Sequence, residues 1–141
     1  SMSRDWVADI KKMHEYYGVN NVVEKMTSKQ LLDYFNFRVN FLREELQELI
    51  DSRDPSDAID ALIDLCVVAI GTLDAFDVNA YDAWDRVLEA NMNKKVGVKE
   101  SRPNPHGLPD LIKPEGWVGP DHSENHSLFD FSFLEMWTVQ K

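Results

Sequence analysis

Residues 54–76, DPSDAIDALIDLCVVAIGTLDAF, decide the fold of this chain. Asp54 is a typical N-cap residue and Pro55 is typical of the first helical position, so a helix should begin here. Apolar residues then lie on every side of this helix as far as about Phe76, a length of roughly 33 Å. Because a helix that is apolar all round is buried, the segment predicts a helical protein built around it.

Three carboxylates interrupt this apolar helix. Asp57, Asp60 and Asp64 are spaced by three and four residues, so they lie along one stripe. A buried carboxylate without a partner is costly, and like charges along one stripe repel each other. Positive charge should therefore face Asp60 and Asp64. Structural salt bridges to Arg or Lys would meet this requirement, and so would a bound cation.

Helical periodicity also extends through the preceding segments. The apolar positions of residues 6–17 recur at helical spacing and stop at Gly18, a common C-terminal residue of helices. Thr27 and Gln30 read as a capping box, which predicts the start of a long helix that ends near Ser52.

Residues 19–26 are expected to form a connector between the first two helices, and Asn79 is expected to cap a fourth helix that fades at Gly97. After this fourth helix the composition of the chain changes. Residues 101–120 contain five of the six prolines, so regular helix is not expected there. The aromatic-rich residues 128–139 predict either a short strand or a segment that lies on another surface.

The predicted fold class is all-α. We expect a four-helix core in residues 3–97 and an extended, Pro-rich C-terminal arm of the same domain in residues 98–141. The length of 141 residues is that of one ordinary domain, and a composition of 43% hydrophobic residues can build a core.

Charge and cysteine content limit the classes of function. The formal net charge of −10 argues against nucleic acid and against an anionic membrane surface as partners. A single cysteine, Cys66, cannot form an intramolecular disulfide and is typical of a reducing compartment. The longest apolar run, residues 65–70, is too short to span a bilayer. We therefore expect a cytoplasmic protein.

A second acidic pattern precedes the central helix. Glu44, Glu45 and Glu48 lie within one quadrant of the long helix, and alone they would indicate only a solvated acidic face. The short turn at residues 51–54 requires the two helices to pack antiparallel, which places Glu45 and Glu48 at about the height of Asp60. Converging carboxylates predict a site for a hard divalent metal, Mg²⁺ or Mn²⁺. The absence of Cys or His pairs argues against structural zinc.

These motifs resemble those of the MazG-like, all-α nucleoside triphosphate pyrophosphohydrolases, especially the branch related to phosphoribosyl-ATP pyrophosphohydrolase. The family pattern is Glu-Glu-x-x-Glu on one helix, seen here as residues 44–48, and an acidic residue with an Asp on the next, seen as residues 60–64. The commoner form of the second motif would place Glu at Ala61, so Asp60 is the implied substitute. Further similarities over residues 5–121 are His14 with Tyr17-Gly18, Arg38, Gly71-Thr72, Asn91 to Lys94 and Lys113 to Trp117.

The resemblance implies hydrolysis of a (deoxy)nucleoside triphosphate to the monophosphate and pyrophosphate. It implies metal ligation by the carboxylates of Glu44, Glu45, Glu48, Asp60 and Asp64. Glu44 or Glu45 is the implied general base. Phosphate or nucleotide contacts are implied for Arg38, Asn91, Lys94 and Lys113. His14 is expected to be a packed or hydrogen-bonded structural histidine.

Other interpretations stay open. Phosphoribosyl-ATP is an alternative substrate, and a non-catalytic helical module that binds a protein partner is an alternative of another class. Within the family, the stand-alone enzymes often found in phages, including MazZ-like enzymes that cleave dGTP, are the closer resemblance. A phage-encoded enzyme would act in the host cytoplasm. The apolar central helix and the resemblance together imply a homodimer or homotetramer.

Overall fold

The computed structural model of the protein describes residues 4–102, 106–107 and 110–130. The chain divides into two compact units, which we call unit 1 (Ser1–Ala80 with His126–Lys141) and unit 2 (Tyr81–Asn125). The predicted division into a core and an arm after Gly97 stays a prediction.

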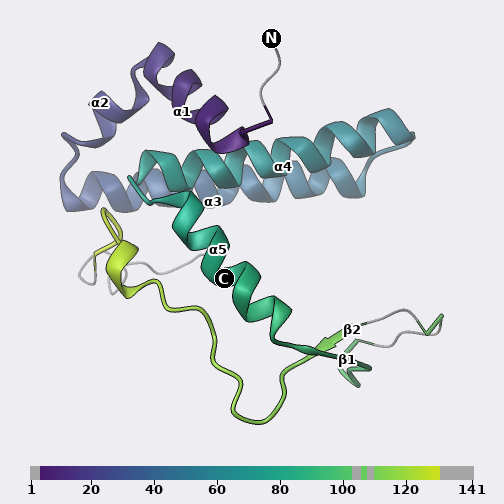
Figure 1. Ribbon diagram of the computed structural model, residues 1–141. Helices are drawn as coiled ribbons and strands as arrows, with labels where there is room; N and C mark the ends of the chain where they lie inside the picture. The colour runs from purple at the N-terminus through teal and green to yellow at the C-terminus, as the bar shows by residue number, and fades with distance from the viewer. Residues whose placement is uncertain (1–3, 103–105, 108–109, 131–141) are drawn as a thin grey trace. The chain divides into compact units, whose positions relative to one another are not determined.

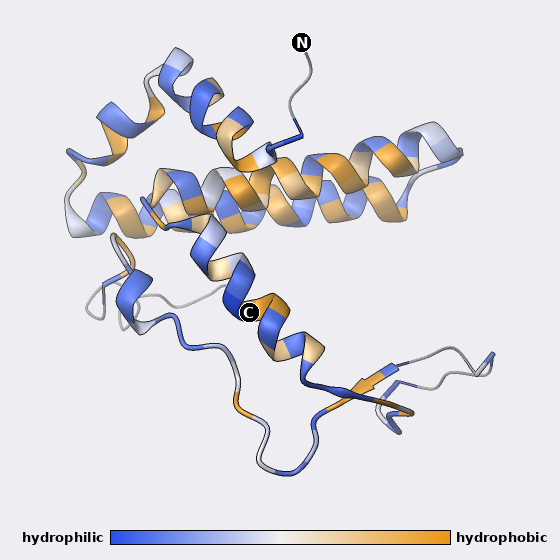
Figure 2. Ribbon diagram, viewed as in Figure 1, coloured by the Kyte–Doolittle hydropathy of each residue, from blue (hydrophilic) through white to orange (hydrophobic). Residues whose placement is uncertain are grey.

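Unit 1 is built on a long antiparallel hairpin of two helices (Figure 1). α3 (Ser28–Ile50) and α4 (Pro55–Ala75) run side by side along this hairpin. α1 (Trp6–Tyr17) packs against α4, and α2 (Val19–Val23) connects α1 to the start of the hairpin. Hydrophobic residues occupy much of α4 (Figure 2). The helical fold confirms the predicted all-α class.

Local capping chemistry sets the ends of these helices. Gly18 ends α1 in the left-handed conformation with φ of 70°, which glycine adopts without steric cost. The Thr27 hydroxyl accepts from the Gln30 backbone N–H, and the Gln30 side chain accepts from the Thr27 backbone N–H, which completes the predicted capping box. The Asp54 carboxylate accepts from the Asp57 N–H at the start of α4.

The connector predicted at residues 19–26 contains the short helix α2. Its last residue, Val23, is only 2% exposed and belongs to the hydrophobic core of unit 1. The burial of Val23 in the core stabilises this short helix, which the local sequence pattern does not predict. Val23 belongs to a cluster of buried residues whose other members are Leu31, Leu32, Ala75 and Phe76.

The chain returns to this core after unit 2. The Phe129 ring stacks on Phe76 with centroids 4.4 Å apart, and the Leu128 N–H donates to the Phe76 carbonyl at 3.2 Å. These two residues therefore lie on another surface, one of the two alternatives predicted for residues 128–139. Residues 131–139 of that prediction lie outside the part of the chain that the structure describes.

Unit 2 contains most of α5 (Ala80–Met92), followed by two short strands. β1 (Lys95–Gly97) pairs antiparallel with β2 (Asp110–Ile112), with Val96 opposite Leu111. The sequence predicted that the fourth helix would fade at Gly97. It ends at Met92 instead, and after a turn at residues 93–94 the chain is paired as a strand from Lys95. A 3₁₀ turn lies at Ser123–Asn125.

None of the helices in residues 4–102, 106–107 and 110–130 is both long and apolar enough to cross a membrane.

Candidate metal and nucleotide site

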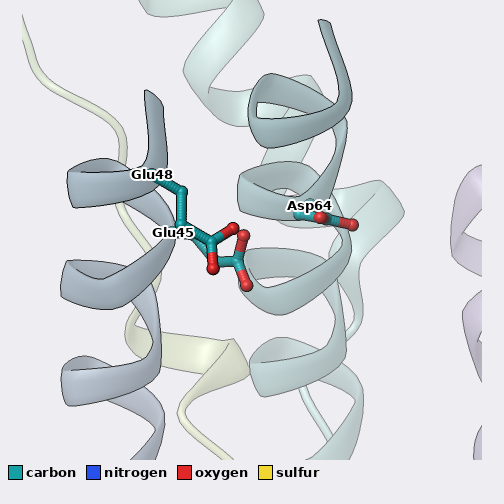
Figure 3. Close-up of side chains that lie close together, drawn as sticks. All are labelled: Glu45, Glu48 and Asp64. Carbon is teal, nitrogen blue, oxygen red and sulfur yellow. The ribbon is translucent and has the colours of Figure 1, made fainter. Parts of the chain in front are cut away.

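Three carboxylates lie close together on the two helices of the hairpin in unit 1 (Figure 3). Glu45 and Glu48 extend from one face of α3, and Asp64 extends from α4. Each offers one oxygen, and these three oxygens all lie within 4.8 Å of one another. We call Glu45, Glu48 and Asp64 the acidic cluster. Its formation follows from the antiparallel packing that the short interhelical turn imposes.

Glu45 is the buried member of the acidic cluster. The residue is 8% exposed, and its Oε2 atom has no hydrogen-bond partner in the described part of the chain. Burial raises the pKa of Glu45 above its ordinary value, and the negative charges of Glu48 and Asp64 raise the pKa further. A buried carboxylate oxygen without a donor is unfavourable, so the site requires a positive group or a proton.

No described lysine or arginine supplies that positive group. Among the residues that the structure places, the ion pairs involve Asp33, Asp74, Asp82 and Asp110, and none involves the acidic cluster. The salt-bridge interpretation of Asp60 and Asp64 therefore gains no support. Three carboxylates with an unpartnered buried oxygen suit a hard divalent cation such as Mg²⁺ or Mn²⁺, which prefers oxygen ligands.

Arg38 lies on α3 two turns before Glu45, and its guanidinium is directed at α4. Nε donates to the Thr72 hydroxyl and Nη2 donates to the Val68 carbonyl, both at 2.9 Å. The guanidinium carbon also lies 5.6 Å from the centre of the Phe41 ring. Arg38 therefore ties the two helices of the hairpin together, and its role as a phosphate ligand stays a prediction.

Two predicted phosphate-binding lysines meet at one aromatic ring in unit 2. The Nζ atoms of Lys94 and Lys113 lie 5.3 Å and 5.0 Å from the centre of the Trp117 ring. Trp117 is fixed by its Nε1–H, which donates to the Ala90 carbonyl at 2.8 Å. Asn91, the next residue of α5, is half-buried. Two lysines distant in sequence thus both place their ammonium groups against the same ring.

Comparison with protein-family profiles matches residues 18–91 to the family described as phosphoribosyl-ATP pyrophosphohydrolase. This chain belongs to that family. Comparison with curated proteins and comparison with solved structures gave no match. The phosphoribosyl-ATP pyrophosphohydrolase family is part of the MazG-like superfamily, so the resemblance read from the sequence is confirmed.

Family membership gives the acidic cluster a chemical context. The matched residues 18–91 include all three carboxylates, whereas Lys94 and Lys113 lie beyond the match. Members of the phosphoribosyl-ATP pyrophosphohydrolase family are nucleotide pyrophosphohydrolases, which cleave phosphoanhydride bonds. The MazG-like enzymes typically depend on a divalent metal, which suits the charge and chemistry of the cluster.

The remaining predicted acids have different surroundings. Glu44 and Asp60 are exposed and stand outside the group of three whose oxygens converge in the described residues. Asp60 still acts on the site through its charge, because it contributes to the raised pKa of Glu45. Metal ligation by Glu44 and Asp60, and general-base catalysis by Glu44 or Glu45, stay predictions.

The sequence analysis missed Asp74, a buried acid near the end of α4. Asp74 is 5% exposed, and its carboxylate lies 3.0 Å from Lys11 Nζ and 2.7 Å from His14 Nδ1. Burial alone would raise the pKa of Asp74, but hydrogen bonds from Lys11 and then His14 outweigh it and lower the pKa. His14 is thus the hydrogen-bonded structural histidine that was predicted. An isolated acid within an apolar helix was the signal that could have identified Asp74.

Proposed function

We propose that this protein hydrolyses a (deoxy)nucleoside triphosphate to the monophosphate and pyrophosphate with Mg²⁺ or Mn²⁺ as cofactor. The observation that supports this most strongly is the buried Glu45 oxygen, which lacks a donor and lies beside the carboxylates of Glu48 and Asp64. An acidic protein can bind a polyanionic triphosphate only with the help of cations, and this cluster is suited to hold them.

Each acid has a proposed role. Glu45, Glu48 and Asp64 would hold the divalent cation, and Glu44 and Asp60 would complete its ligands. Such a cation, when bound, neutralises phosphate charge and lowers the pKa of the attacking water. Glu44 or Glu45 would accept the proton of that water.

Cationic side chains would bind the phosphates. Lys94 and Lys113 would contact phosphate oxygens as point charges, and the Asn91 amide would donate to another oxygen. Their support is the shared Trp117 ring, which holds both ammonium groups in one small region of unit 2. Arg38 stays a proposed phosphate contact on resemblance alone, since two of its donors are bonded to α4.

Phosphoribosyl-ATP is the second candidate substrate, because the matched family carries its name. The preference for dGTP rests on the resemblance to MazZ-like enzymes. A non-catalytic interaction module is the weakest alternative, because such a module has no need for a buried, unpaired carboxylate. The single cysteine and the nucleotide substrate favour the cytoplasm, that of the host if the protein is phage-encoded.

A substrate panel tests this proposal. Eight nucleoside and deoxynucleoside triphosphates and phosphoribosyl-ATP would be incubated with Mg²⁺ or Mn²⁺, and released pyrophosphate and single phosphate would be measured separately. We expect pyrophosphate from at least one triphosphate, with dGTP among the best. Turnover of phosphoribosyl-ATP alone would favour the second candidate. Single-phosphate release, or no turnover of any compound, would contradict the proposal.

Self-association is the proposed assembly. Large apolar side chains near the turn of the hairpin are 44–65% exposed, so this surface is available for a second copy in a homodimer or homotetramer. Light scattering should give a mass of two or four chains, and Ile59→Lys should reduce it. A wild-type mass of one chain would contradict this assembly. The exposed residues are Leu46, Ile50, Ile59, Leu62 and Ile63.

A further inference from the structure

We propose that Arg38 is a positioning residue for the metal centre. It holds α3 and α4 in one axial register, and this register brings Glu45 within reach of Asp64. The inference rests on the proposed function, because it concerns the metal that the acidic cluster would hold. It assigns Arg38 a task that needs no contact with phosphate.

Arg38, Thr72 and Val68 form a closed set of hydrogen bonds. Arg38 Nε–H donates to the Thr72 hydroxyl oxygen, and Arg38 Nη2–H donates to the Val68 carbonyl, both at 2.9 Å. The Thr72 hydroxyl donates its own proton to the same carbonyl at 2.7 Å. Thr72 is 8% exposed, so water competes little for these bonds. We call this set the Arg38 clamp.

The clamp lies close to the acidic cluster along both helices. Glu45 follows Arg38 by seven residues on α3, and Asp64 precedes Val68 by four residues on α4. Because the helices are antiparallel, both steps lead in the same direction, toward the interhelical turn. The register that the clamp fixes is therefore the register in which the two carboxylates meet.

A small slip between the helices would be enough to disrupt the site. One residue of a helix corresponds to about 1.5 Å along its axis. Mg²⁺ requires oxygen ligands at about 2.0–2.1 Å in near-octahedral geometry, so a slip of that size removes a ligand. Apolar contacts between α3 and α4 are non-directional. The directional bonds of the clamp are suited to select one register.

Gly71 makes room for the clamp. A Cβ atom at this position would lie 2.7 Å from Arg38 Nη2 and 3.4 Å from His14 Nε2. Any other residue would displace the guanidinium from the Val68 carbonyl. Alanine is favoured over glycine within a helix. Glycine at position 71 therefore makes α4 less stable but leaves room for the Arg38 guanidinium.

Two substitutions at Thr72 test the inference in the full chain. Thr72→Val keeps the shape but removes the hydroxyl, whereas Thr72→Ser retains it and serves as the matched control. The Kd of Mn²⁺ would be measured without nucleotide by electron paramagnetic resonance of free Mn²⁺. We expect a ten- to hundredfold weaker Kd for Thr72→Val, as for other residues that orient metal ligands, and a value within about twofold of wild type for Thr72→Ser.

Gly71→Ala separates positioning from general stability. It should weaken Mn²⁺ binding through loss of the Arg38 bond, while the thermal midpoint stays near that of wild type because the helix preference of alanine offsets the lost bond. This variant also decides the matter if Thr72→Val does not fold. Wild-type Mn²⁺ affinity in every folded variant of the clamp would overturn the inference and leave the proposed function intact.

Arg38→Met distinguishes positioning from direct phosphate binding. A positioning residue predicts weaker Mn²⁺ binding without nucleotide, and the same defect in Thr72→Val. A phosphate ligand predicts a raised KM for the triphosphate with unchanged Mn²⁺ affinity, which would overturn the inference. A wild-type protein that binds no Mn²⁺ would instead overturn the metal centre of the proposed function, and the inference with it.

Discussion

Glu45 on α3 and Asp64 on α4 present carboxylate oxygens within 4.8 Å of each other across the hairpin. Neither makes an ion pair with a lysine or arginine in the part of the chain that the structure describes. Two acids brought this close, one of them buried, repel each other unless a cation or a proton intervenes. Such an arrangement is suited to bind a metal and unsuited to stabilise the protein by itself.

Turnover should require a divalent cation. Removal of metal with excess EDTA should abolish pyrophosphate release, and added Mg²⁺ or Mn²⁺ should restore it, because both ions accept octahedral oxygen ligands. Release of pyrophosphate would be followed before and after each addition. Full activity in excess EDTA would show that the acidic cluster does not act through a metal.

Neutral analogues of the cluster acids should lose activity. Glu48→Gln and Asp64→Asn keep side-chain shape but remove a charged ligand, so kcat should fall by about a hundredfold or more while the circular dichroism spectrum is unchanged. Glu24→Gln, which changes an exposed acid elsewhere in unit 1, is the matched control. Near wild-type rates in both cluster variants would assign these acids a structural role.

The sequence predicted the helices of unit 1 well because their ends are set by local chemistry. Thr27 and Gln30, which form the capping box, lie three residues apart, and Gly18 ends α1 through its own backbone conformation. Such helix ends can therefore be predicted from a few consecutive residues. The pairing of β1 with β2 was not predicted. Its two strands are three residues each and are distant in sequence, so no local pattern indicates their register.

The acidic cluster was predicted only in part from local spacing. Glu45 and Glu48 are one helical turn apart, and the short turn predicted that they lie at about the height of Asp60. The structure brings their oxygens close to Asp64 instead, one turn further along α4, which the sequence had included as a ligand through the family resemblance. The Asp74 site depends instead on how α1 packs against α4. Asp74 meets His14 across 60 residues of sequence, and nothing local to either residue indicates that contact.

The two lysines of unit 2 should contribute to substrate binding. Lys94→Met and Lys113→Met should each lower kcat/KM for the triphosphate about 10- to 100-fold, which corresponds to a lost hydrogen bond to a charged group. Lys95→Met, at a neighbouring exposed lysine, is the control. Steady-state kinetics at several salt concentrations would show the loss. Unchanged kcat/KM in both variants would remove these lysines from the site.

Asp74 should make the protein sensitive to acid. Its pKa lies below the ordinary value of 3.8 because hydrogen bonds from Lys11 and His14 outweigh its burial. A lowered pKa contributes stability above the ordinary pKa, and this contribution is lost as the pH falls through the lower value of the folded state. The free energy of unfolding should therefore drop below pH 3.8.

Asp74→Asn isolates this contribution. At neutral pH it should cost about 2–3 kcal/mol, since it removes the charge that accepts from Lys11 and His14. Denaturant titrations at several pH values would show a shallower loss of stability below pH 3.8 in the variant than in wild type. If the free energy of unfolding falls equally steeply with pH in wild type and in Asp74→Asn, Asp74 is not the source of the acid sensitivity.

The final prediction uses the sign of a stability change to separate a metal centre from a salt bridge. If Asp64 repels Glu45 and Glu48, Asp64→Asn should raise the thermal midpoint of the metal-free protein. A cation that binds only the folded state stabilises wild type by about 2.7 kcal/mol at a hundredfold excess over Kd. The variant should lose most of this response to Mn²⁺.

A structural salt bridge at Asp64 predicts the opposite result. Removal of a buried paired carboxylate leaves a cation uncompensated and should destabilise the protein by about 3–5 kcal/mol. Thermal melts of wild type and Asp64→Asn, each with EDTA and with Mn²⁺, measure both effects in one experiment. Because the two interpretations differ in direction, the comparison does not depend on the size of either effect. If Asp64→Asn lowers the thermal midpoint, and if Mn²⁺ leaves the thermal midpoint of wild type unchanged, a metal at Asp64 is excluded.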